Sequence, residues 1–390
     1  MSKGLKPENV WDYLKSVRTL SAQALPFAAK EGYPFSFWLP ETVQKTLHEI
    51  DRRCGGVLDE DQGPPADQAE PYIISSLMEE AIASSQIEGA ATTRKVAKEM
   101  LQTGRKPRDK GEQMIFNNWA TMQHLRQIKD RPLSLQMLLE IHALITHKTL
   151  DDENDAGRIR THNDVVVRYD DEVIHDPPDW QTLEGRLAVL CSFANDDAPW
   201  IHPVVKASIL HFMLGYDHYF ADGNGRTARA IFYWYLLSRK YAIFEYLSIS
   251  RHFLAAPAKY VKAYLDSEFD GGDLTYFIVY SMRAMQAALD DLQKYLKRKQ
   301  AEAKKAETLL RGYRDLNHRQ RDLLLHALKH TDARYTIAGH RKLQGVARGT
   351  ARRDLLELAE RGLVEMRRVG RTFVFYPSES LKKDLGKQVD

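Results

Sequence analysis

The chain has 390 residues, 43% of them hydrophobic and 10% aromatic, which suits two or three folded domains of ordinary soluble composition. It contains no apolar run of about 18 residues, and its beginning, MSKGLKPENV, lacks the apolar stretch of a signal peptide, so we expect no membrane partner and a cytoplasmic location. With only two cysteines, Cys54 and Cys191, we expect neither a disulfide framework nor a cysteine metal site.

The net charge of +3 is unevenly distributed along the chain. Between Asn317 and Pro377 there are 13 Lys and Arg against 6 Asp and Glu, a surplus of +7 that leaves −4 for the remaining residues. This asymmetry indicates a separate basic module with a polyanionic partner.

The N-terminal part, up to about residue 70, reads as helices interrupted by Pro and Gly, ending in a turn-rich connector over 54–71. Apolar residues then recur at helical spacing over 72–88, and Gly89 ends that helix. Thr92 or Thr93 can cap the next helix.

The middle of the chain continues this helical pattern. A helix over 134–150 precedes two β-like runs within 161–178, the only convincing hairpin signal before the basic module. A helix beginning at Pro203 is apolar nearly all round and is expected to be central and buried, and another covers 226–240. From Met282 the pattern becomes charged, as in a solvated connecting helix.

The basic module has its own pattern of elements. Helices are predicted over 317–330, 338–345 and 348–362, followed by a hairpin over 363–377 with Gly370 in its turn. Three helices and a basic hairpin are typical of a winged helix-turn-helix. The predicted fold class is therefore mainly α, with this small domain at the end.

The stretch HYFADGNGRTAR, residues 218–229, carries the chemistry. Its Gly-Asn-Gly allows successive backbone N–H groups to converge before a helix N-terminus, which suits an anion. Arg226 and Arg229 share a helix face and could reach one polyphosphate. Asp222 could hold Mg²⁺, and His218 is a base whose ordinary pKa is near neutrality. The alternative is an ordinary loop with an exposed histidine.

This constellation resembles the signature of the Fic family, His-x-Phe-x-[Asp/Glu]-Gly-Asn-Gly-Arg-x-x-Arg. The matching residues are His218, Phe220, Asp222, Gly223, Asn224, Gly225, Arg226 and Arg229. Tyr219 stands where most members have Pro. The likeness covers about residues 70–290, including a flap over 164–175, and SSQIEGA at 84–90 resembles the family's inhibitory motif.

The resemblance implies a helical Fic core with a β-hairpin flap that transfers AMP from ATP to a Ser, Thr or Tyr hydroxyl of a target protein. His218 would take the hydroxyl proton, and Asp222 would hold Mg²⁺. The backbone nest of Gly223, Asn224 and Gly225 would cradle the phosphate oxygens.

The resemblance also assigns roles around these residues. Arg226 and Arg229 would neutralise the β- and γ-phosphates, and Phe220 would anchor the loop. Glu88, four residues after Ser84, would pair with Arg229 and keep the nucleotide phosphates in an unproductive orientation. The flap would position the target segment by strand pairing.

Other functions remain open at this point. The same fold could remove AMP or transfer another phosphate group, or it could sense nucleotide in a DNA-binding regulator. Duplex DNA is a candidate partner for the basic module, and a homodimer is compatible with the sequence. The DNA-contacting side chains would be Thr350, Arg352, Arg353, Arg367, Arg368 and Arg371.

Two further interpretations concern the domains and the histidines. The predicted parts are an N-terminal helical region over 1–110, a Fic core over 111–290, a connecting helix over 291–316 and a winged helix over 317–380. A zinc site at His202, His211 and His218 is not expected, because it would need a further ligand and convergent geometry.

Overall fold

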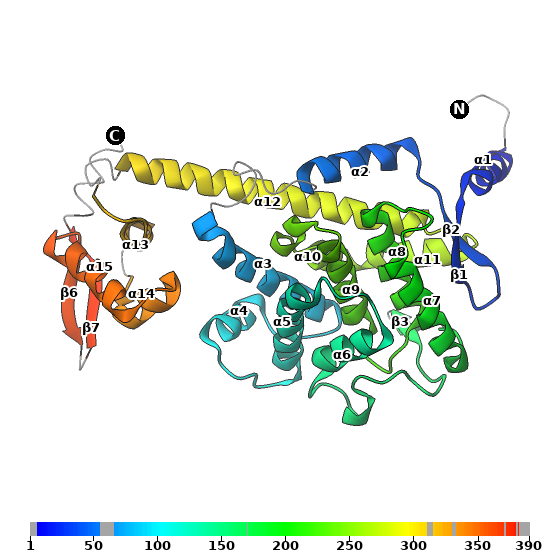
Figure 1. Cartoon of the computed structure of the whole chain (residues 1–390), viewed down its shortest axis with the longest axis horizontal. Helices are drawn as coiled ribbons and strands as arrows, with labels where there is room; N and C mark the ends of the chain where they lie inside the picture. The colour runs from blue at the N-terminus through cyan, green and yellow to red at the C-terminus, as the bar shows by residue number, and fades with distance from the viewer. Residues whose placement is uncertain are drawn as a thin grey trace. The chain divides into compact units, whose positions relative to one another are not determined.

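The computed structural model describes residues 6–54, 66–169, 171–309, 315–329, 333–369, 372–379 and 381. The chain divides into two compact units, Met1–Gln293 and Lys294–Asp390, and is mainly helical, as predicted (Figure 1). The four-part division stays a prediction. Most of the connector over 54–71, together with Gly370 and Arg371, lies outside the described residues.

Helices make up most of the first unit. They are α1 (Pro7–Ser21), α2 (Glu41–Cys54), α3 (Ala66–Ile87), α4 (Arg94–Thr103), α5 (Lys110–Ile128), α6 (Leu135–Thr146), α7 (Leu183–Asn195), α8 (Pro203–Asp217), α9 (Asn224–Ser238), α10 (Ser250–Ala255), α11 (Pro257–Phe269) and α12 (Thr275–Leu309), which continues into the second unit. Short 3₁₀ turns are η1 (Glu153–Asp155), η2 (Trp180–Thr182) and η3 (Ala242–Tyr246). None of the helices in the described ranges has the length and apolar character that a bilayer span requires.

The paired helices α8 and α9 form the centre of this unit. The prediction of a buried helix from Pro203 is confirmed, because nearly every residue of α8 is buried. Pro203 occupies the first turn, and the His202 ring accepts the Val204 N–H at 3.3 Å. α9 is also buried along most of its length, so the loop between the two helices is held at both ends by packed core.

Two helix ends predicted from sequence are confirmed. The α3 helix stops before Gly89, whose φ of 89° is a left-handed conformation that glycine adopts without strain. Thr93 caps α4, its hydroxyl accepting the Val96 N–H at 3.5 Å, and Gly104 at the other end has φ 68°. These local signals determine where α3 ends and where α4 begins.

The prediction that the N-terminal part contains helices alone was wrong. Strands β1 (Gln23–Ala28) and β2 (Pro34–Phe37) form an antiparallel hairpin whose apolar side chains alternate inward. Pro26 and Pro34 concealed it, because proline normally argues against a strand. Both strands of a two-stranded sheet are edge strands, in which proline is tolerated. The outer edge of β2 bonds through Ser36 to Gly272 and Leu274. The hairpin predicted within 161–178 is present as β3 (Val167–Tyr169) and β4 (Glu172–His175).

The second unit contains the predicted helices and hairpin. They are α13 (His318–Lys329), α14 (Ile337–Gln344), α15 (Arg348–Glu360), β6 (Val364–Val369) and β7 (Thr372–Pro377), and β5 (Tyr335–Thr336) adds a third strand in the order β5-β7-β6. Leu324, Leu355 and Phe375 lie in its fully buried core. Asp354 accepts hydrogen bonds from Arg319 and His340, which ties α15 to α13 and α14. The assignment as a winged helix-turn-helix stays a prediction.

Candidate active site

The loop from His218 to Gly223 joins α8 to α9 and carries the predicted site. His218 itself ends α8 in a left-handed conformation (φ 49°), and Gly223 precedes α9 with φ 84°. A side chain at Gly223 would meet the Thr146 methyl group, since a Cβ there would lie 2.7 Å from it. Glycine is therefore required at position 223 for two reasons: the left-handed backbone conformation and the close approach of α6.

The ring of His218 has a defined tautomer. Its Nδ1 lies 2.9 Å from the Gly215 carbonyl oxygen, which can only accept, so Nδ1 carries the proton and Nε2 keeps its lone pair. Burial lowers the pKa of His218 to about 4, although the bond to Gly215 and the nearby Glu88 carboxylate act in the opposite direction. His218 is thus neutral at pH 7 and able to accept a proton.

Asp222 is the carboxylate that directly precedes α9 and its anion nest. Its side chain is 51% exposed, Oδ1 accepts the Gly223 N–H, and the same oxygen lies 3.5 Å from Nη2 of Arg226. Within the described residues no group of three His, Cys, Asp or Glu side chains could hold a metal ion. A single accessible carboxylate still fits Mg²⁺, because that ion is commonly held by one or two carboxylates, water and substrate phosphates.

The nest expected at Gly223, Asn224 and Gly225 is shifted by one residue, because the Gly223 N–H already donates to Asp222 Oδ1 and the N–H groups left for an anion are those of the first turn of α9. The N–H groups of Asn224, Gly225 and Arg226 belong to the first turn of a helix, where no intrahelical partner exists. The Asn224 amide side chain is already engaged, accepting the Phe220 N–H at 2.9 Å and donating to the Phe220 carbonyl at 2.7 Å. Asn224 therefore shapes the loop with its side chain, and its contribution to an anion site comes through its backbone.

Arg226 and Arg229 have different surroundings despite sharing a helix. Arg226 is 1% exposed and donates from Nη1 to the Ile145 carbonyl at 3.2 Å, so part of its guanidinium is used inside the protein. Arg229 donates from Nε to the Ser84 hydroxyl at 2.8 Å and from Nη2 to the Ser84 carbonyl at 2.9 Å. The sequence did not distinguish these two environments.

Glu88 follows the last turn of α3 and meets Arg229 directly. Glu88 Oε1 lies 2.8 Å from Nη2 of Arg229, as the resemblance implied. A Cβ at Gly225 would overlap the same Glu88 oxygen, so this carboxylate lies at the N-terminus of α9. Although burial alone would raise the pKa of Glu88, Arg229 and Arg226 outweigh it and hold the pKa below its usual range. Glu88 is therefore negatively charged, and it lies at the N-terminus of a helix, where the helix dipole stabilises negative charge.

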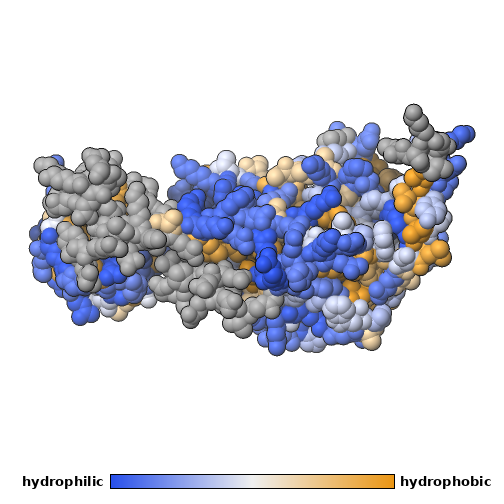
Figure 2. Space-filling model, turned by 90° about the horizontal axis from the view of Figure 1, so that it is seen from above, coloured by the Kyte–Doolittle hydropathy of each residue, from blue (hydrophilic) through white to orange (hydrophobic). Residues whose placement is uncertain are grey.

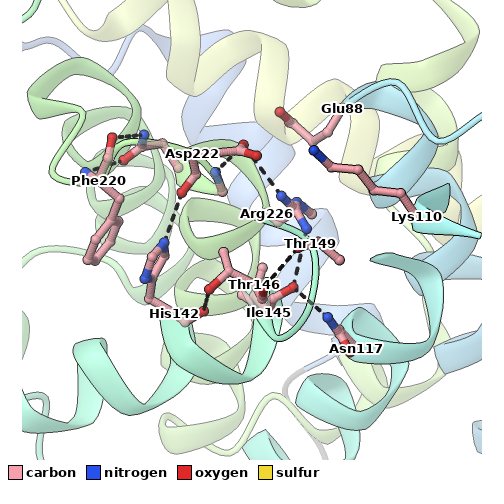
Figure 3. A network of polar contacts seen from close by, with 12 residues as sticks. Glu88, Lys110, Asn117, His142, Ile145, Thr146, Thr149, Phe220, Asp222 and Arg226 are labelled. Carbon is pink, nitrogen blue, oxygen red and sulfur yellow. Dashed lines mark hydrogen bonds and ion pairs between the residues drawn. The ribbon is translucent and has the colours of Figure 1, made fainter. Parts of the chain in front are cut away.

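His142 is a residue of the site that the sequence did not indicate (Figure 3). It lies on the buried face of α6, and its Nε2 donates to the Asp222 carbonyl at 2.8 Å while Nδ1 accepts the Gly157 N–H at 2.9 Å. Its ring stacks on Phe220 with centroids 3.7 Å apart. Burial is the main cause that lowers the pKa of His142 to about 4, so the ring is neutral and positions the loop.

Arg160, in the segment before the flap, also positions the loop. Its backbone N–H donates to the Tyr219 carbonyl at 2.9 Å, and its Nε donates to the His218 carbonyl at 2.9 Å. A further bond reaches the Pro178 carbonyl, beyond the second flap strand. Through these bonds the buried Arg160, 4% exposed, connects both ends of the flap to the backbone of the loop at His218.

The remaining histidines considered from sequence lie outside the signature loop, although His211 shares Tyr260 as a partner with Arg229. His202 Nε2 lies 2.8 Å from an Asp51 carboxylate oxygen, and His211 Nε2 lies 2.8 Å from the Tyr260 hydroxyl among packed aromatic rings. Both have structural partners of their own.

The site lies in a segment of the chain that matches a known protein family. Residues 132–236 match the model of the Fic/DOC family. The chain contains a Fic domain. Over 100 residues it is 33% identical to Protein adenylyltransferase fic-1 of Caenorhabditis elegans, and over 104 residues 32% identical to Protein adenylyltransferase Fic of Nematostella vectensis. These alignments cover 25% and 26% of this chain and 18% and 22% of those proteins.

Solved structures extend the likeness of the fold beyond the Fic domain. A Fic family protein from Desulfovibrio desulfuricans G20 is similar with a TM-score of 0.62 over 88% of this chain and 98% of that one, at 18% identity. Residues 134–508 of Fic-1 from C. elegans give a TM-score of 0.52 over 65% of this chain and 71% of that one, at 20% identity. At these identities the likeness concerns the fold alone.

Proposed function

We propose that this chain is a protein adenylyltransferase, which transfers AMP from ATP to a hydroxyl group of a target protein. The observation that carries the proposal is the neutral His218 ring next to an anion nest within a Fic domain, its Nε2 making no hydrogen bond to any residue that the structure describes. The adenylyltransferases that match over this domain support the same activity.

In the proposed reaction, Nε2 of His218 accepts the proton of the target hydroxyl as its oxygen attacks the α-phosphorus. The new bond joins this oxygen to phosphorus, the bond to the β-phosphate breaks, and pyrophosphate leaves. The bond from Nδ1 to Gly215 keeps the ring oriented and stabilises the protonated imidazolium that forms. The first-turn N–H groups of α9 bind phosphate oxygens. Asp222 would hold Mg²⁺, which supplies positive charge against the phosphates.

Glu88 and Ser84 are proposed to inhibit this reaction. Arg229 is the cation available for the terminal phosphate, but it is bound by the Ser84 hydroxyl and the Glu88 carboxylate. The Glu88 carboxylate also lies where a phosphate oxygen would meet the α9 N-terminus. ATP phosphates would therefore settle in an orientation poor for attack as long as Glu88 remains.

The flap is proposed to orient the target segment. Its strands pair only with each other among the described residues, so an extended segment of a target could add to a free edge. Backbone pairing of this kind tolerates many sequences. The hydroxyl of a Ser, Thr or Tyr would then be presented to His218.

The test is incubation with Mg²⁺ and ATP labelled at the α-phosphate, using wild type, Glu88→Gly and the double variant Glu88→Gly/His218→Ala. We expect label on protein with Glu88→Gly and at least a hundredfold less with the double variant. Label from γ-phosphate but not α-phosphate would indicate phosphate transfer instead. Loss of AMP from a premodified protein without its addition would indicate the reverse reaction.

A second proposal concerns duplex DNA and the second unit. Arg348, Arg352 and Arg353 are exposed on α15, and none of the three has an ion-pair partner among the described residues. Arg368 adds an exposed cation on β6. Unpaired guanidinium groups on one helix suit phosphate contacts, which make affinity fall with salt.

Fluorescence polarisation with labelled duplex DNA at low salt tests this second proposal. Arg352→Ala/Arg353→Ala should weaken binding roughly tenfold or more and flatten its salt dependence. The control is Arg361→Ala, since that arginine is already paired with Asp315 at 2.6 Å. Absence of salt-dependent binding by wild type would reject DNA as the partner.

A further inference from the structure

The flap ends at a histidine that is bonded on both sides of its ring. His175 is the last residue of β4, and its side chain is only 8% exposed. Its Nδ1 lies 2.8 Å from Oε2 of Glu268, and its Nε2 lies 2.7 Å from the Tyr216 carbonyl oxygen. A carboxylate and a carbonyl can only accept, so both ring nitrogens carry a proton and His175 forms an ion pair with Glu268.

Tyr216 connects this ion pair with the catalytic histidine. It lies in the last turn of α8, two residues before His218, and its own ring packs against the His175 ring with centroids 4.8 Å apart. The bond from His175 Nε2 thus holds the end of β4 against the turn that leads into His218. Among the residues that the structure describes, neither His175 nor Glu268 bonds to the anion nest or to its two arginines.

Glu268 stands on a helix whose side chains pack against α8. Tyr264, four residues earlier on the same side of α11, stacks on Phe212 of α8 with centroids 5.0 Å apart. A Cβ at Gly215 would lie 2.5 Å from the Tyr264 hydroxyl oxygen, and the Gly215 carbonyl is the group that orients the His218 ring. The flap and the catalytic ring are therefore attached to neighbouring, closely packed parts of the same unit.

The C-terminal end of α11 is held by charges as well. Just beyond Glu268, Asp270 lies 2.8 Å from Nζ of Lys15, and Asp273 pairs with Arg18. No residue of α1 is buried, and hydrophobic residues lie at the surface at this end of the first unit in Figure 2. The contribution of α1 to the position of Glu268 is thus mainly ionic.

The other contacts of the flap are weaker or hold a different part of it. Lys30 pairs with Asp176 at 2.7 Å, but their side chains are 37% and 65% exposed, and such a pair contributes little. Arg160 holds the two ends of the flap segment through backbone carbonyl groups. The ion pair of His175 is buried and acts on strand β4 itself.

We propose that His175 and Glu268 are positioning residues for AMP transfer: their ion pair holds β4 against the last turn of α8 and thereby sets where an acceptor hydroxyl on the flap meets His218. This rests on the proposed function, in which the flap orients the target segment. A displacement of about 1 Å between reacting groups is enough to lower a rate on the order of a hundredfold. Loss of the pair should therefore slow transfer and leave nucleotide binding unchanged.

Two replacements of Glu268 in the Glu88→Gly background test the proposal. Glu268→Gln supplies an amide N–H that can donate to Nδ1 of a neutral ring, so both bonds of His175 remain possible. Glu268→Ala leaves Nδ1 without a partner. The initial rate of self-labelling from α-phosphate-labelled ATP should fall roughly tenfold or more with Glu268→Ala and less than about twofold with Glu268→Gln.

Nucleotide binding and a matched carboxylate serve as controls. The dissociation constant of an ATP analogue with a methylene group between the α- and β-phosphates, measured by calorimetry, should differ by less than about twofold between these variants. Asp266→Ala removes a carboxylate of the same helix that pairs with Lys262 at 2.6 Å at the surface, and it should label at the rate of Glu88→Gly alone.

Hydrogen exchange followed by mass spectrometry measures the flap independently of activity. With Glu268→Ala the amides of residues 164–175 should exchange roughly tenfold faster, whereas those of α8 should not change and Glu268→Gln should behave as wild type. Full labelling by Glu268→Ala, weaker binding of the analogue, labelling by Glu268→Gln as slow as by Glu268→Ala, or faster exchange throughout α8 overturns the proposal. Absence of labelling by Glu88→Gly alone would instead reject the proposed function, and hydrogen exchange would still decide whether the pair holds the flap.

Discussion

Replacing Glu88 in two steps measures how much the pair with Arg229 restrains catalysis. Glu88→Gln keeps the shape and an oxygen acceptor for Nη2 of Arg229 but removes the negative charge. Glu88→Gly removes the side chain and clears the N-terminus of α9, where a Cβ at Gly225 would overlap the carboxylate. The two variants therefore separate the charge from the occupied space.

The contact distances give the expected magnitudes. The bond between Glu88 Oε1 and Arg229 Nη2 is 2.8 Å and charge-assisted, which contributes about 1.5–3 kcal/mol. Its complete loss in Glu88→Gly should raise the rate of AMP transfer roughly ten- to a hundredfold. Glu88→Gln should raise it about fivefold, because a neutral bond retains about 0.5–1.5 kcal/mol. The Ser84 bonds to Arg229 remain in both variants.

The assay is the initial rate of label incorporation from α-phosphate-labelled ATP at saturating ATP and Mg²⁺. The matched control is Glu79→Gln, on the same helix, whose carboxylate pairs with Arg94 at 2.6 Å and makes no bond to Arg229. That variant should label at the wild-type rate. Equal rates for wild type, Glu88→Gln and Glu88→Gly would refute the inhibitory role of Glu88.

Three further predictions follow from the surroundings of individual residues. Because the pKa of His218 is lowered to about 4, transfer by Glu88→Gly at saturating substrates should change by less than about twofold between pH 7.5 and 5.5, whereas a histidine of ordinary pKa would lose roughly tenfold. His142→Phe keeps the stacking on Phe220 but loses two hydrogen bonds, so kcat should fall roughly tenfold with KM for ATP changed less, as steady-state kinetics would show. Glu80→Ala should lower the free energy of unfolding in urea by about 3–5 kcal/mol, since it leaves buried donors without their acceptor.

Local features of the chain were sufficient to predict much of the helical frame. Thr93, Gly89 and Pro203 act on their own neighbours, through a hydroxyl, a left-handed conformation and a fixed φ, so their effect is visible in a short stretch. The loop from His218 to Arg229 is also contiguous, which is why a pattern of residue types could indicate its chemistry.

The parts that were missed depend on residues far apart in the chain. The β1–β2 hairpin is stabilised because Phe35 and Phe37 are buried by the rest of the unit. In the sequence, its prolines argued against strands more strongly than its alternating apolar residues argued for them. His142 and Arg160 reach the loop from 80 and 58 residues away, with ordinary helix and loop sequences around them. No spacing rule connects such positions, because only the packing of α6 and the flap on the loop brings them together.

Two carboxylates on one face of α3 have different roles: Glu80 holds the helix against the core, and Glu88 binds Arg229. Glu80, Ser84 and Glu88 are four residues apart, so they follow one line along the helix toward α9. Glu80 is 1% exposed and accepts the Tyr233 hydroxyl at 2.9 Å and the Ser250 N–H at 3.0 Å, and none of these bonds involves Arg229. Breaking the bond from Glu88 to Arg229 therefore leaves the hydrogen bonds of Glu80 intact. The change is confined to the end of the helix, because Gly89 follows Glu88 and ends α3. Inhibition and stability should accordingly respond to different residues of the same helix: Glu88 sets the rate, and Glu80 sets how firmly α3 is held.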